Sequence, residues 1–165
     1  MTPLQRCIDA LKQPGQPQPF YAALDQAVRD TVGHILFTLL YRSPDGKRAK
    51  RIYTNMPKEY PVGGFKEVTA TPWSAHVIDG QRAYIGYTAE DIRWAFYDHE
   101  LIKSLGCDSV VNMPVIYDGR VLGTMNLLAG ARHYSEQDIP RLEPFAALLI
   151  APFLQAIDAD PDRAG

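Results

Sequence analysis

The sequence predicts an α+β domain with a central antiparallel sheet of about five or six strands, flanked by helices. Segments with helical spacing alternate with segments of period two along the chain. The stretch SVVNMPVIYDGRVLGTMNLLA, residues 109–129, also contains two apolar runs joined by Asp118-Gly119. Asp-Gly between apolar runs is a strong hairpin signal, because both residues adopt positive φ at low cost. The hairpin is therefore the most secure part of the predicted sheet.

The first part of the chain is expected to form two helices and then two strands. The segment QPGQPQP interrupts the first helix with prolines and a glycine, so residues 1–19 are predicted to be an N-terminal helix and a proline-rich linker. The prolines and glycines at 56–71 indicate a long binding loop or lid. In chain order, we expect helices at 2–12 and 20–32, strands at 34–42 and 49–55, and then this loop.

The second part of the chain places the hairpin between helices. Pro140, Pro144 and Pro152 predict a kink or break in the last helix, because an interior proline removes one backbone hydrogen bond. The whole domain is predicted to span residues 20–157, followed by a disordered tail at 158–165. The expected elements are a short helix at 71–80, a strand at 83–87, a helix at 88–105, the hairpin, and a final helix that begins at Ser135.

Composition excludes several classes of protein. The 165 residues, 46% of them hydrophobic, suit one compact domain with a sizeable core. A net charge of -2 lacks the basic excess that phosphate neutralisation needs, so we expect no nucleic-acid partner. No apolar run approaches the roughly 20 residues of a membrane span, and we expect a cytoplasmic protein. Cys7 and Cys107 are too few for a disulfide framework or a zinc cluster, so no metal site is predicted.

The run LGCDSVVNMPVIYDGRVLGTMNLL, residues 105–128, resembles the GAF domain family. It matches the family pattern of a small-residue entry, a strand ending in Met-Pro-Val, a turn with glycine, and a Gly-x-Met strand. Residues 134–138 then open the closing helix as the family does. The resemblance covers roughly residues 19–155. The segments RIYTNMPKEYPVGG, TPW and WAFYDHELIKSLG also look like stand-alone bacterial GAF proteins.

The resemblance implies a sensory module that holds a small molecule in a cavity between sheet and helices. It implies N- and C-terminal helices packed together on one face, a homodimer, and an effector protein reached in trans. Cyclic-nucleotide-binding members carry Lys and Glu where this chain has Leu127 and Ile139. Members that reduce free methionine sulfoxide use several cysteines, and an acid where this chain has Asn126. Bilin-binding members need an attachment cysteine in or near the pocket, and Cys107 is not obviously placed for it, so the cofactor remains unknown.

Polar side chains on the predicted strands are the first candidates for ligand contacts. Asn112 and Asn126 interrupt the apolar hairpin, and a buried amide costs roughly 1–3 kcal/mol unless it finds partners. Counting from the turn places Asn112 opposite Met125 and diagonal to Asn126, so the two amides either satisfy each other or contact a ligand. Arg51 and Tyr53 are two positions apart on their strand and are expected to share one face of it. That face is either exposed to solvent or forms a donor-rich wall for a ligand.

Aromatic residues outside the hairpin are further candidates. Trp73 and His76 are three positions apart on the short helix and therefore share a face. They form either an aromatic lid over the cavity or a plug at the edge of the core. Tyr60, in the long loop, is expected to contact the ligand as well.

One helix offers a candidate for catalysis. With 100° per residue, His99 falls in the middle of the apolar stripe of the helix at 88–105, and Asp98 lies at its margin. His99 is either a core histidine bonded to a backbone carbonyl or, with Asp98, a general acid or base. The sequence thus leaves three functions open: a ligand-binding sensory module, a small enzyme that uses His99 on a small polar metabolite, and a dimerisation module.

Overall fold

A computed structural model describes residues 1–162 and contains a six-stranded antiparallel sheet with the strand order β3-β2-β1-β6-β5-β4. Residues 163–165 of the predicted disordered tail lie outside the described residues. The strands are β1 (Leu36–Arg42), β2 (Arg48–Thr54), β3 (Phe65–Glu67), β4 (Tyr84–Gly86), β5 (Ser109–Tyr117) and β6 (Arg120–Ala129). Asp118 and Gly119 both have positive φ at the β5–β6 turn, as predicted.

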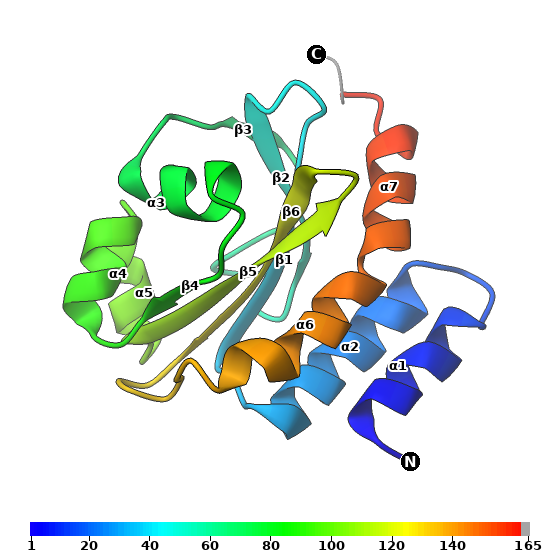
Figure 1. The fold of residues 1–165 in the computed structure, drawn as a ribbon, viewed down its shortest axis with the longest axis horizontal. Helices are drawn as coiled ribbons and strands as arrows, with labels where there is room; N and C mark the ends of the chain where they lie inside the picture. The colour runs from blue at the N-terminus through cyan, green and yellow to red at the C-terminus, as the bar shows by residue number, and fades with distance from the viewer. Residues whose placement is uncertain (163–165) are drawn as a thin grey trace.

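Helices cover both faces of the sheet (Figure 1). One face carries helices from the two ends of the chain, which confirms the predicted packing: α1 (Pro3–Leu11), α2 (Gln18–Thr31), α6 (Asp138–Leu148) and α7 (Ile150–Ala159). The other face carries α3 (Pro72–Ser74), the π-helical turn η1 (Ala75–Asp79), α4 (Ala89–Ala95) and α5 (His99–Ser104). The architecture is α+β, as the sequence predicts.

The main hydrophobic core lies between the sheet and the helices α1, α2, α6 and α7. Phe37 and Leu39 of β1 point toward these helices and are fully buried. Gly123 of β6 shows how tight the packing is, because a Cβ there would lie 2.1 Å from the Leu40 carbonyl oxygen and 2.7 Å from the Phe153 ring. Only glycine fits this approach of β6 to β1 and α7.

The last helix is broken, as its prolines predict. α6 and α7 meet at Leu149 with a bend of 45°. Pro152 lies in the first turn of α7, where its ring has no N–H to donate and crowds the preceding turn. Within residues 1–162, no single helix is long and apolar enough to cross a membrane, although the bent α6–α7 pair passes that test by length and composition alone.

Two segments depart from the predicted boundaries. The long loop contains β3, which pairs with β2 through Arg48 opposite Glu67 and Lys50 opposite Phe65. A strand of three residues is too short to leave a period-two pattern in the sequence. At the other end, α7 continues through residues 158–159, which the sequence assigns to the tail, and Lys50 Nζ lies 2.7 Å from Asp160 Oδ2.

Candidate functional site

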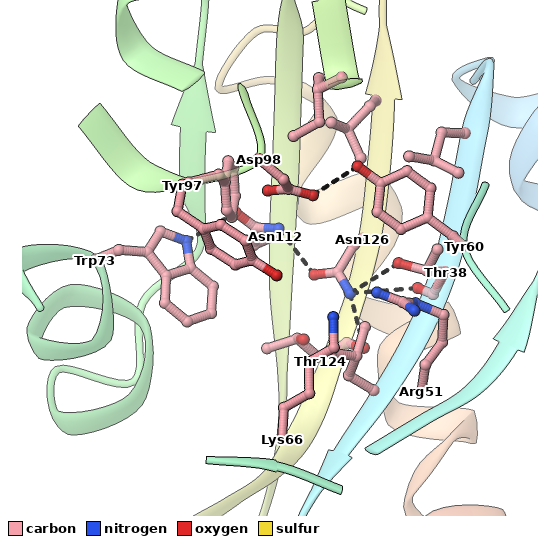
Figure 2. A pocket seen from close by; sticks show the side chains of 15 residues that line it. Thr38, Arg51, Tyr60, Lys66, Trp73, Tyr97, Asp98, Asn112, Thr124 and Asn126 are labelled. Carbon is pink, nitrogen blue, oxygen red and sulfur yellow. Dashed lines mark hydrogen bonds between the residues drawn. The ribbon is translucent and has the colours of Figure 1, made fainter. Parts of the chain in front are cut away.

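A cavity of about 230 Å³ lies between the sheet and the α3–α5 face. Its polar side chains converge from strands β1, β2, β3, β5 and β6 and from the segments around them (Figure 2). It is smaller than the roughly 300–1,000 Å³ of pockets that bury drug-sized ligands, so a small molecule would fill it. The lining residues are Leu36, Thr38, Leu40, Arg51, Tyr60, Lys66, Trp73, Phe96, Tyr97, Asp98, Ile102, Asn112, Thr124, Asn126 and Leu128.

A chain of hydrogen bonds crosses the floor of the cavity. The Trp73 indole N–H donates to Asn112 Oδ1 at 2.9 Å, and Asn112 Nδ2 donates to Asn126 Oδ1 at 2.8 Å. Asn126 Nδ2 lies 3.3 Å from Thr38 Oγ1 and 3.5 Å from the Thr124 carbonyl oxygen. The amides are 2% and 7% exposed, so the amide pair satisfies part of its own hydrogen bonding while it faces the cavity.

A β-bulge corrects the predicted pairing of the two asparagines. Asn112 lies directly opposite Asn126, and the prediction that it faces Met125 is wrong. Near the turn Ile116 pairs with Val121, whereas Val115 pairs with Gly123. Leu122 of β6 therefore has no partner on β5 and is the extra residue of the bulge. Each extra residue shifts the register by one for every later pair. The two amides are therefore adjacent rather than diagonal.

A second β-bulge separates Arg51 from Tyr53. Leu39 pairs with Tyr53 and Leu40 pairs with Arg51, which leaves Ile52 as the extra residue of β2. The bulge reverses the alternation, so Arg51 faces the cavity whereas Tyr53 packs against the main core. The prediction that Arg51 and Tyr53 share one face is wrong for this reason.

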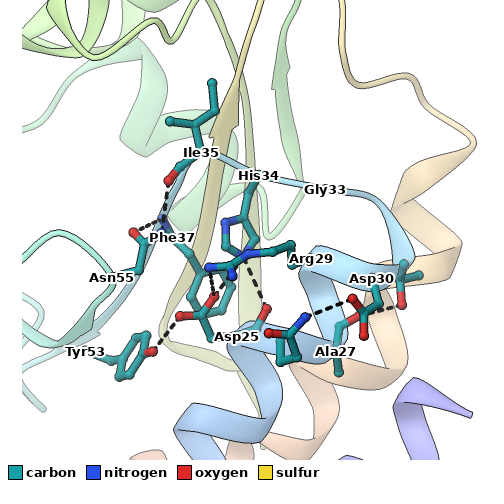
Figure 3. A network of polar contacts seen from close by, with 12 residues as sticks. Asp25, Ala27, Arg29, Asp30, Gly33, His34, Ile35, Phe37, Tyr53 and Asn55 are labelled. Carbon is teal, nitrogen blue, oxygen red and sulfur yellow. Dashed lines mark hydrogen bonds and ion pairs between the residues drawn. The ribbon is translucent and has the colours of Figure 1, made fainter.

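Tyr53 instead joins a buried network on the far side of the sheet (Figure 3). Its hydroxyl donates to Asp25 Oδ2 at 2.5 Å, and His34 Nε2 lies 2.9 Å from Asp25 Oδ1. Burial opposes ionisation of Asp25, but hydrogen bonds from His34 and Tyr53 and the charges of His34 and Arg29 bring its pKa below the usual value. This network ties α2 to β2 and to the segment that precedes β1, and it contributes no group to the cavity.

One wall of the cavity is built around Arg51. Its guanidinium lies 4.9 Å from the centre of the Tyr60 ring, and its Nη1 donates to the Pro61 carbonyl oxygen at 3.0 Å. The Tyr60 hydroxyl donates to Asp98 Oδ2 at 2.6 Å. Burial, and then the bond to Asp98, raise the pKa of Tyr60 above its usual value, so this hydroxyl stays protonated as a donor. The wall therefore presents a guanidinium and a carboxylate to the same space.

The helix predicted at 88–105 is broken, and the break supplies the cavity with Asp98. α4 ends where Phe96 adopts extended backbone, with φ -132° and ψ 133°, and α5 begins at His99. Phe96, Tyr97 and Asp98 form the connection and line the cavity. His99 starts a new helix and does not line the cavity, and its imidazole has no hydrogen bond within residues 1–162. The prediction of one continuous helix with His99 in its apolar stripe is wrong.

The short helix places its two candidate residues, Trp73 and His76, in different surroundings. Trp73 lines the cavity, with its ring 6.0 Å from that of Phe96. His76 Nε2 instead contacts the Ala83 carbonyl oxygen at 2.8 Å, outside the cavity. One α-helical turn passes here into the wider π-helical turn η1, so positions three apart no longer share a face.

Several residues that line the cavity were not predicted from the sequence. Lys66 points into the cavity from β3, the strand that left no pattern (Figure 2). Thr38 and Thr124 carry a weak signal, because Thr124 is two positions from Asn126 and therefore shares its face of β6. Tyr97, which is 86% exposed, lies at the cavity mouth. Asp is a common residue at helix N-caps, so Asp98 was the one local sign in the sequence that a second helix begins at His99.

Neither cysteine lines the cavity. Burial raises the pKa of Cys7 and of Cys107 to about 11, so both thiols stay protonated near neutral pH. Among residues 1–162, no group of three or more His, Cys, Asp and Glu side chains is placed to hold a metal ion.

An antiparallel sheet with terminal helices on one face, and on the other a small cavity lined by apolar and polar side chains, is an α+β sensory-module architecture. The chain belongs to the GAF domain family, whose model matches residues 20–150. A search of curated protein sequences finds no significant match.

Solved structures support the same fold. The GAF domain of an Acinetobacter phosphoenolpyruvate-protein phosphotransferase is 14% identical, with a TM-score of 0.73, 96% of this chain covered and 94% of that chain. The GAF domain of a Bacillus halodurans two-component sensor histidine kinase is 13% identical, with a TM-score of 0.64 and coverages of 84% and 92%. A far-red cyanobacteriochrome photoreceptor is 13% identical, with a TM-score of 0.64 and coverages of 92% and 92%.

Proposed function

We propose that this protein is a sensory or regulatory module that binds a small molecule in the cavity between the sheet and α3–α5. The observation that carries the proposal is the convergence of six predicted candidates on one cavity: Arg51, Tyr60, Trp73, Asp98, Asn112 and Asn126. They come from separate segments of the chain, so their convergence is a property of the fold. Buried amides and an arginine weaken a core unless something uses them, which favours a ligand.

The solved relatives support the sensory part of the proposal. Similar folds occur in a two-component sensor histidine kinase and in a photoreceptor, which are signalling proteins by their names. We propose that this module acts as a stand-alone cytoplasmic homodimer and passes its signal to an effector in trans. Light scattering on the full chain, with and without ligand, tests the dimer. A monomer under both conditions would contradict that part of the proposal.

The enzyme alternative has less support. A general acid or base must reach the substrate within hydrogen-bonding distance, and His99 does not line the cavity. Asp98 does line it, but the lining residues, all of which lie within residues 1–162, include no histidine, cysteine or serine to act beside it. We therefore retain binding without turnover as the proposed function.

A cavity-filling variant tests the proposal. Leu40→Trp places an indole in the cavity without adding volume to the packed core, because Leu40 lines the cavity. Ile116→Trp is the control, since Ile116 is 38% exposed and lies outside this cavity. In a thermal-shift screen against a metabolite library, we expect ligands that stabilise the wild type and Ile116→Trp but not Leu40→Trp. Equal stabilisation of all three proteins would place binding elsewhere and contradict the proposal.

A further inference from the structure

Two cationic side chains, Arg51 and Lys66, line the cavity, and neither forms an ion pair within residues 1–162. Arg51 Nε is buried and has no hydrogen-bond acceptor within residues 1–162. Nη1 of the same guanidinium donates to the Pro61 carbonyl oxygen. Lys66 has neither an ion pair nor a hydrogen bond within the same residues. Water can satisfy the exposed Lys66 ammonium, but a buried guanidinium N–H that lacks an acceptor is costly. Arg51 is therefore the stronger sign that an acceptor belongs in the cavity.

The charges on the cavity wall do not balance. Arg51 and Lys66 are positive, and Asp98 is the one negative residue among the lining residues. One carboxylate oxygen of Asp98 already accepts from Tyr60, whose hydroxyl is neutral. The wall thus carries one excess positive charge, whereas the whole protein carries a net charge of -2. A concave positive site on an acidic protein favours the entry of an anion.

The rest of the wall indicates what the anion is attached to. Trp73 lies across the cavity from Arg51 (Figure 2), and its ring is 6.0 Å from the ring of Phe96, so these two residues provide aromatic surface on that side. Their rings offer contact to a flat apolar group, and Leu36 and Leu128 close the cavity from the sheet. A volume of about 230 Å³ limits the ligand to a small molecule with a single ring system.

We propose that the cavity binds a small aromatic carboxylic acid as its monoanion, with the carboxylate toward Arg51 and Lys66 and the ring against Trp73 and Phe96. The inference rests on the proposed function, because it names the class of ligand for the same cavity. A planar guanidinium suits a carboxylate, since it can donate two parallel hydrogen bonds. The ammonium of Lys66 adds a second, adjustable donor.

Calorimetric titration with matched probes tests the inference. The probes are benzoate and phenylacetate, their neutral amides benzamide and phenylacetamide, and the cation benzylamine. We expect the wild type to bind at least one carboxylate roughly tenfold or more tightly than its amide, and to bind benzylamine more weakly still. If neither carboxylate binds, or if amide and acid bind equally, the inference is overturned.

Three variants locate the effect. Lys66→Gln is expected to weaken carboxylate binding roughly tenfold and amide binding much less, and its exposed position leaves the fold intact. Arg51→Gln should have a larger effect, while Lys58→Gln, on an exposed loop residue outside the cavity, should have none. Unchanged carboxylate affinity in Lys66→Gln and Arg51→Gln overturns the inference. Carboxylate binding to Leu40→Trp as tight as to the wild type would instead contradict the proposed function itself.

Discussion

Tyr53→Phe separates a structural tyrosine from a ligand-binding one. The substitution removes one hydroxyl and keeps the ring, which packs at 5.9 Å from the rings of Tyr21 and Phe37. The lost bond is the one that the hydroxyl donates to the Asp25 carboxylate. A hydrogen bond to a charged group contributes about 1.5–3 kcal/mol, so the free energy of unfolding should fall by about that amount. Ligand affinity should not change, because Tyr53 faces away from the cavity.

The other partners of Asp25 set the limits of this estimate. His34, whose side chain is 0% exposed, keeps its contact with Asp25 in the variant. Arg29 lies 3.4 Å from the Asp25 carboxylate, but its side chain is 47% exposed. Its ion pair can therefore compensate for about 1 kcal/mol of the lost hydrogen-bond energy at most. For a chain of this length, the loss corresponds to a decrease in Tm of roughly 3–12 °C.

Urea unfolding at several pH values measures the effect. Because the pKa of Asp25 is lowered in the folded protein, its stabilisation is present above the unfolded value of roughly 3.9 and is lost as pH falls through the folded value. The gap between wild type and variant should thus be constant from about pH 7 to about pH 5 and shrink below about pH 4.

Tyr41→Phe is the matched control for this experiment. Tyr41 is 2% exposed on the same face of the sheet, and its hydroxyl has no hydrogen bond within residues 1–162. Its loss should change stability by less than about 0.5 kcal/mol. Equal stability of Tyr53→Phe and wild type, together with a loss of ligand affinity, would refute the assignment of Tyr53 to the core.

Three further outcomes follow from packing and burial. Gly123→Ala should lower the free energy of unfolding by about 3 kcal/mol in urea titrations, because its Cβ would overlap a β1 carbonyl; wild-type stability would contradict the close approach. Cys7 and Cys107 should resist iodoacetamide at pH 8 in the folded protein and react in urea, as mass spectrometry can follow, since burial raises each pKa to about 11; rapid native labelling would contradict their burial. Trp73→Phe should weaken ligand binding roughly two- to tenfold by calorimetry, because the indole no longer holds the β5 amide; unchanged affinity would count against the hydrogen-bonded floor.

Local signals were sufficient for much of the fold. The Asp118-Gly119 turn, the two N-terminal helices and the break near Pro152 all depend on residues within a few positions of each other. Asn112 and Asn126 were found because polar residues are out of place in buried strands. These predictions needed no knowledge of which segments meet in space.

The errors have a common physical origin in long-range packing. The bulge at Ile52 turns Arg51 and Tyr53 to opposite faces, yet neither residue type signals a bulge. The helix break at Phe96 occurs without glycine or proline, and it allows Asp98 to meet Tyr60 across the cavity. Lys66 reaches the cavity from a strand that exists because β2 offers it a free edge.

Native mass spectrometry of the protein purified from its own host tests the central claim most directly. Wild type should carry a small bound molecule whose mass identifies the ligand, and Leu40→Trp prepared in the same way should carry none. A bound molecule that persists at equal occupancy in Leu40→Trp, or the absence of any bound molecule from wild type under conditions that preserve the fold, would contradict a ligand-binding cavity.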